Sequence, residues 1–132
     1  MAPIFFEDDT LKMMQKHLDL STQRQSLIAS NISNIDTPGY KTVDLDFQKE
    51  LKAAMEAQNA RIEVTHPLHI APSKEAVGTP IQVENLPMRN DLNNVSIDRE
   101  MAVIASNHLM FSFVVDRIAG KFRTLKSVIE EK

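Results

Sequence analysis

Histidines are the side chains in this sequence whose spacing first suggests chemistry. His66 and His69 stand three residues apart in the run His66-Pro67-Leu68-His69, and two imidazoles at that spacing could bind one metal ion. A protein zinc site, however, uses three or four ligands. The proline between the histidines also prevents the regular helix that would align them. We therefore expect no metal site in this segment.

Other residue types needed for catalysis are missing or isolated. The chain of 132 residues has no cysteine, which excludes disulfides, thiolate metal ligands and cysteine nucleophiles. Gly78 is the only glycine between Gly39 and Gly120, so a glycine-rich phosphate-binding loop is excluded. The acidic run at residues 7–9 is typical of a helix start. We predict that the chain is not an enzyme and binds no metal or cofactor.

Composition and charge exclude further classes of protein. Only 3 glycines, no tryptophan and 5% aromatic residues argue against a β-sandwich or barrel. A net charge of −3, without a basic patch interleaved with aromatics, gives no reason to expect nucleic-acid binding. The first residues lack a basic region followed by an apolar core, so we expect no cleaved secretory signal. No apolar run approaches ~18 residues, and we expect no membrane-spanning segment.

A long helix is predicted from residues 8–10 to Ile35. Its apolar residues recur at steps of three and four, which is the pattern of one helix face. They are Leu11, Met14, Leu18, Ile28, Ile32 and Ile35, with Ser21 and Gln25 filling two slots between them. The helix runs into Thr37-Pro38-Gly39, where proline and glycine suit the central positions of a type II turn, with positive φ at the glycine. The sequence therefore predicts a helix that ends in a sharp turn of fixed direction.

The end of the chain has the strongest periodic pattern. Apolar residues alternate at steps of four and three, as in a coiled coil. We call these positions the predicted seam: Ile97, Met101, Ile104, His108, Phe111, Val115, Ile118, Phe122, Leu125 and Ile129. Ser96 is a suitable N-cap for this helix. His108 is the one polar member, and we interpret it as a buried core histidine that could fix the helix register.

This last helix has more apolar surface than one partner helix can cover. Val103, Leu109, Met110, Phe113 and Val114 add apolar side chains beside the predicted seam. A helix that is apolar nearly all round must be buried on several sides. Either the middle region folds over it or neighbouring subunits cover it, and we favour the second, which makes the helix a polymerisation surface.

The middle of the chain is predicted to be mixed. A short helix is expected at 45–59, and residues 61–65 and 81–84 alternate like short strands. Acidic residues at the start of the first helix and basic residues near the end of the last favour antiparallel pairing of the two long helices. The predicted fold is mainly α: an antiparallel, coiled-coil-like pair of terminal helices with a small β-containing insertion. Segments 1–43 and 96–132 would form one helical core domain, and 44–95 the insertion.

The turn region also resembles a known family. A helix end followed by Thr-Pro-Gly-Tyr is similar to the N-terminal signature of the bacterial flagellar axial proteins, which include rod and hook subunits. The matching residues are Ala29, Asn31, Ile32, Asn34, Thr37, Pro38, Gly39, Tyr40 and Lys41, while Ser30 and Ser33 replace the common Asn and Ala. Asn93-Asn94-Val95, with Glu100-Met101, resembles the proximal rod proteins most. Leu92 departs from the pattern, because the family has glycine there, and Thr65 with His69 matches a pattern that is structural in the family.

This resemblance implies a function that the residue patterns alone do not supply. It implies a structural subunit of the basal-body rod, exported without a cleaved signal by the flagellar type III apparatus and assembled in the periplasm. The implied partners are copies of the chain, other proximal rod proteins and the small adaptor at the rod base. Two alternatives stay open: a cytosolic helical adaptor or type III export chaperone, and a muralytic hydrolase. An adaptor or chaperone has no need of the Thr-Pro-Gly-Tyr turn. A hydrolase would need a cleft with carboxylates, and a chain dominated by two long helices leaves little room for one.

Overall fold

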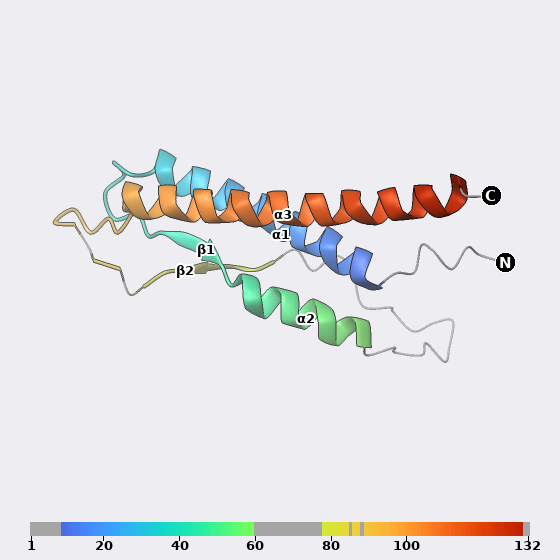
Figure 1. Cartoon of the computed structure of the whole chain (residues 1–132). Helices are drawn as coiled ribbons and strands as arrows, with labels where there is room; N and C mark the ends of the chain where they lie inside the picture. Colours follow the sequence, from blue (N-terminus) through green and yellow to red (C-terminus); the bar gives the residue numbers. More distant parts are fainter. Residues whose placement is uncertain (1–8, 60–77, 85, 88, 131–132) are drawn as a thin grey trace.

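Two long antiparallel helices dominate the structure, a computed structural model that describes residues 9–59, 78–84, 86–87 and 89–130. Helix α1 comprises Asp9–Ser33 and helix α3 comprises Ile97–Glu130. Figure 1 shows them lying side by side and running in opposite directions, with α3 reaching beyond the start of α1. The predicted antiparallel pair of terminal helices is confirmed.

The middle elements lie along α1. Strand β1 (Val43–Leu45) pairs antiparallel with strand β2 (Pro80–Gln82), so that Val43 faces Gln82 and Leu45 faces Pro80. Helix α2 (Phe47–Asn59) follows β1 and packs, as β1 does, against α1. The sequence predicted α2 and most of β2 but not β1, and the predicted strand at 61–65 lies outside the described residues.

Local sequence explains where these helices begin. The Asp46 carboxylate accepts a hydrogen bond from the backbone N–H of Lys49 at 3.1 Å, which caps the N-terminus of α2. Ser96 precedes α3, and its carbonyl accepts the N–H of Glu100 at 2.9 Å, the first hydrogen bond of that helix. The predicted start of α3 at Ser96 is therefore correct.

The interior of the described chain is unusually polar. The buried apolar side chains are Leu20, Ile28, Leu45, Val95 and Val114. The buried polar ones are more numerous: Ser21, Asn31, Thr42, Asn93, Asn94, Glu100 and Asn107. Every buried side-chain nitrogen and oxygen in the described part has a hydrogen-bond partner. Directional hydrogen bonds therefore share with apolar packing the task of holding this fold together.

Helix α3 qualifies the expectation that no segment could span a membrane. Of the described helices it alone is long and apolar enough to do so by length and composition. Few of its residues are buried inside the subunit, and a helix that packs against other proteins passes the same test. Length and composition alone are weak support for a membrane span. The low burial shows that most of the surface of α3 is available to contact another molecule.

Candidate functional site

The turn after α1 has the geometry that its sequence predicts. The Tyr40 N–H donates to the Thr37 carbonyl at 3.3 Å, closing a four-residue turn around Pro38 and Gly39. Gly39 has φ of 73°, as the third position of a type II turn requires. The Gly39 N–H then donates to the Asp91 carbonyl at 2.8 Å. The turn is therefore attached to the loop that leads into α3.

Asn93 joins that loop to the end of α1. Its side chain is fully buried, and its amide nitrogen lies 3.0, 3.1 and 2.8 Å from the carbonyls of Asn34, Ile35 and Thr37. Its amide oxygen accepts the Val95 N–H at 2.7 Å. One asparagine thus satisfies the carbonyls that a helix end leaves unpaired and also fixes the chain that enters α3.

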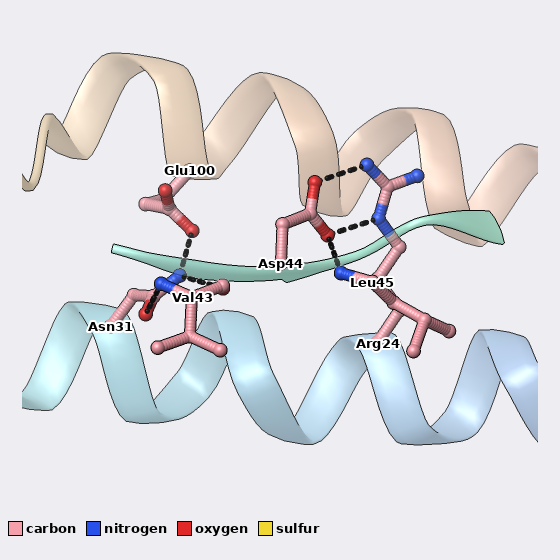
Figure 2. Close-up of polar contacts among 6 residues, drawn as sticks. All are labelled: Arg24, Asn31, Val43, Asp44, Leu45 and Glu100. Atoms are coloured by element: carbon pink, nitrogen blue, oxygen red, sulfur yellow. Dashed lines mark hydrogen bonds and ion pairs between the residues drawn. The ribbon is translucent and has the colours of Figure 1, made fainter. Parts of the chain in front are cut away.

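Asn31 connects α1, β1 and α3, as Figure 2 shows. Its amide nitrogen donates to the Val43 carbonyl at 2.8 Å and to the Glu100 carboxylate at 3.1 Å. Its amide oxygen accepts the Val43 N–H at 3.0 Å and the Tyr40 hydroxyl at 3.2 Å. Since both hydrogens and both lone pairs are used, no other side chain of this size could replace it. Asn31 therefore fixes the helix pair and the strand in one register.

Asn94 and an ion pair complete the attachment of β1. The Asn94 oxygen accepts the Thr42 N–H at 2.6 Å, and its nitrogen donates to the Val83 carbonyl at 2.8 Å. Arg24 on α1 binds both oxygens of Asp44 at 2.8 and 2.7 Å, the two-pronged contact drawn in Figure 2. We call the buried Asn31, Asn93, Asn94 and Glu100 the asparagine network.

Leu92 adopts the left-handed conformation that the family pattern assigns to glycine. Its φ of 63° is the only positive value among the described non-glycine residues. The Leu92 N–H donates to the Arg89 carbonyl at 2.9 Å, and the Leu92 carbonyl accepts the Lys41 ammonium at 2.9 Å. The sharp turn therefore persists without glycine, at a conformational cost of roughly 1–2 kcal/mol.

The packed face of α3 differs from the predicted seam. Glu100, Asn107 and Val114, spaced seven residues apart, are the buried positions of α3. Asn107 donates to the Ser21 carbonyl of α1 at 2.9 Å. Asn107 was missed because periodicity ranks residues by hydrophobicity, and nothing in the sequence pattern marks this polar residue as buried.

The predicted seam divides into two unequal groups. Four positions are half-buried on the side of α3 that packs against α1: Ile104, Phe111, Ile118 and Leu125. The other six are exposed, and we call them the outer row: Ile97, Met101, His108, Val115, Phe122 and Ile129. The interpretation of His108 as a buried core histidine is wrong, since it is exposed and its ring nitrogen lies 3.3 Å from the Ser112 hydroxyl of its own helix. Whether the predicted seam acts in assembly stays a prediction.

A second exposed apolar group lies elsewhere on α3. Leu109, Met110 and Phe113, which we call the central patch, are 74%, 57% and 58% exposed. Successive residues turn about 100° around a helix, so Phe113 of the central patch and Val115 of the outer row point to nearly opposite sides. Two separate apolar surfaces therefore flank the contact between α3 and α1.

The structure offers no arrangement typical of catalysis in the part that it describes. No group of three or more His, Cys, Asp or Glu side chains there could hold a metal ion. His66 and His69 lie outside the described residues. His17 packs edge-on against Phe47 with ring centroids 4.6 Å apart, and burial lowers its pKa from 6.5, but it has no carboxylate partner in that contact.

Comparisons with known proteins bear on the same regions. Residues 18–41, which contain the end of α1 and the Thr37–Tyr40 turn, match the family model described as flagella basal body rod protein. The chain is 34% identical to the flagellar basal body rod protein FlgB of Salmonella typhimurium, over 93% of this chain and 94% of that protein. It is 31% identical to FlgB of Bacillus subtilis, over 91% of this chain and 92% of that protein. FlgB of Aquifex aeolicus is 28% identical over similar shares.

Proposed function

The chain belongs to the FlgB family of flagellar basal body rod proteins, and we propose that it builds the rod through the two exposed apolar surfaces of α3. It is a structural subunit of the flagellar basal body rod, and it assembles there with other rod components. This membership favours the rod subunit over the adaptor, chaperone and hydrolase alternatives.

The exposed apolar surface of α3 is the observation on which the proposal depends. Leu109, Met110 and Phe113 lie within little more than one helical turn and are all more than half exposed. Single exposed apolar residues are ordinary, but a contiguous group marks a contact site. Burying each such side chain is worth about 1.5–3 kcal/mol. A neighbouring subunit that covers the central patch would therefore gain several kcal/mol.

Two apolar surfaces on opposite sides of one helix fit a polymer better than a dimer. A closed two-fold dimer uses one self-complementary surface, whereas head-to-tail contacts need two different surfaces and generate rings or helical filaments. The outer row and the central patch supply such a pair. We infer that one surface meets each of two neighbouring subunits in the rod.

The asparagine network has a supporting role in this proposal. Subunits in a filament must present their surfaces at a constant angle, because an error repeats with every copy. Asn31 and Asn93 fix α3 against α1 and against the Thr37–Tyr40 turn through hydrogen bonds of 2.8–3.1 Å. The family motif thus sets the geometry of the surfaces rather than forming them.

Partners and location follow as further proposals. Copies of the same chain, adjacent proximal rod proteins and the small adaptor at the rod base are the proposed neighbours. The proposed route is export by the flagellar type III apparatus without a cleaved signal, followed by assembly in the periplasm. We also propose that the chain has no enzymatic activity and binds no cofactor, since a rod subunit needs neither.

Phe113→Asp tests the proposal directly. Phe113 is 58% exposed, so a charge there should leave the free subunit folded but place a carboxylate inside a subunit contact. In a strain that lacks its own copy of the gene, we expect no rods in isolated basal bodies and no motility. Phe113→Leu should restore both.

Two further results make the test decisive. Gln48→Asp, at an exposed position of α2, is the matched control and should assemble normally. Circular dichroism of purified Phe113→Asp should match that of the unmodified chain. If the Phe113→Asp subunit is exported, folds and builds normal rods, the central patch is not an assembly surface.

A further inference from the structure

A groove lies where the start of α1 passes the second half of α3. Its volume is about 1030 Å³, and Leu11, Met14, Phe122 and Leu125 contribute its apolar lining. Ligand pockets in proteins measure about 300–1,000 Å³, so this groove has room for several large side chains. The groove lies beside the second half of α3, away from the asparagine network, and of the described residues that line it only Phe122 belongs to the outer row and none to the central patch.

Charge distinguishes this groove from the other apolar surfaces. Among the described residues that line it, Arg117, Lys121 and Arg123 are cationic and Asp116 is acidic. This described part of the rim therefore carries more positive than negative charge. A suitable occupant therefore combines large apolar side chains with adjacent negative charges.

The residues just before α1 have this combination. Residues 4–6 are Ile-Phe-Phe, and residues 7 and 8 are Glu and Asp. We propose that the segment 1–8 binds in this groove of its own chain, with Phe5 and Phe6 against the apolar lining and the two acids against the basic rim.

Distance and concentration favour the chain's own segment over that of a second copy. Leu11, in the groove, is only five residues after Phe6, and five extended residues span about 17 Å. A short tether gives an effective concentration in the millimolar range. A free subunit at micromolar concentration should therefore fill the groove from within its own chain.

Phe5→Trp provides a reporter, because the chain has no tryptophan of its own. Docking predicts that tryptophan emission from the folded full-length chain is blue-shifted relative to the urea-unfolded chain and resists acrylamide quenching. Adding Leu125→Asp should remove the shift and restore quenching, whereas adding Gln48→Asp should change neither. A tryptophan as exposed in the folded chain as in urea would overturn the proposal.

Cross-linking identifies the occupant, because the chain also has no cysteine. Under mild oxidation, Phe5→Cys with Leu125→Cys should form a disulfide within one chain, at a yield that does not depend on protein concentration. Phe5→Cys with Gln48→Cys is the matched control and should not react. Covalent dimers whose yield rises with concentration would show that a second copy fills the groove, and no cross-link would show that nothing does. Either result refutes the proposal, and neither affects the test with Phe113.

Discussion

Asn93→Ala should strongly destabilise the free subunit, because this side chain joins the end of α1 to the loop that leads into α3. The asparagine is completely buried, and its amide lies within 3.1 Å of the carbonyls of Asn34, Ile35 and Thr37. Its oxygen accepts the Val95 N–H at 2.7 Å. Alanine removes all of these contacts and leaves a small void between the end of α1 and the start of α3.

The expected loss of stability follows from the hydrogen-bond partners that each backbone group keeps after the substitution. The Val95 N–H loses its acceptor, and an unsatisfied buried donor costs about 1–3 kcal/mol. The carbonyls lose less, because the Ile35 carbonyl still accepts Arg89 at 3.0 Å and the Thr37 carbonyl still accepts the Tyr40 N–H. Asn93 has only two amide hydrogens for three carbonyls, so two hydrogen bonds of about 0.5–1.5 kcal/mol each are lost. We expect a destabilisation of about 3 kcal/mol.

Urea unfolding followed by far-UV circular dichroism measures this free energy. Asn90→Ala is the matched control, since Asn90 is in the same loop but exposed, and its effect should stay within about 0.5 kcal/mol. Asn93→Asp should be at least as destabilising as alanine, because it places a charge against three carbonyls. If Asn93→Ala and Asn90→Ala unfold at the same urea concentration, the asparagine network does not hold α3 to α1.

Three other changes test separate features of the fold. Leu92→Gly should stabilise the chain by about 0.5–1 kcal/mol, measured as a raised urea midpoint, because glycine adopts φ of 63° without strain and Leu92 is 61% exposed. Gly78→Ala should destabilise it by about 1–3 kcal/mol, because the added methyl would lie 2.6 Å from a methyl of buried Leu45; an unchanged melting temperature would contradict this. Burial against Phe47 lowers the pKa of His17 from 6.5, so the neutral ring stabilises the fold fully above pH 6.5 and this contribution is lost as the pH falls below it. The loss should be smaller in His17→Gln, and equal pH dependence in both chains would show that His17 does not contribute.

The long helices were predictable because each is determined by local sequence. The apolar spacing and the Thr37–Tyr40 turn predicted both ends of α1 to within about two residues, and Ser96 predicted the start of α3. Strand β1 was not predictable, because Val43–Leu45 is three residues long and has no pattern of its own. It exists because Asn31 and β2 supply partners for its backbone. Such pairing joins residues distant in sequence and leaves no periodic signal.

The candidate site was predictable in composition but not in arrangement. The family motif identified Asn31, Asn93 and Glu100. Only the fold shows that Asn31 donates a hydrogen bond to Glu100 and that Asn93 joins the loop before α3 to the end of α1. The four–three spacing correctly predicted an apolar helix but not which side packs against α1. When a helix is apolar on several sides, hydrogen bonds decide its orientation, and Asn107 with the Ser21 carbonyl supplies one of them.

The polar interior also affects the heat capacity change that accompanies unfolding of the subunit. The heat capacity change of unfolding comes mainly from newly exposed apolar surface, and few large apolar side chains of the described part are buried. The free subunit should therefore show a smaller heat capacity change per residue than the usual ~12–15 cal/mol/K. Burial of Leu109, Met110 and Phe113 between subunits would supply the missing part as a negative heat capacity change of polymerisation. Much of the apolar burial typical of a folded protein would then take place only in the rod.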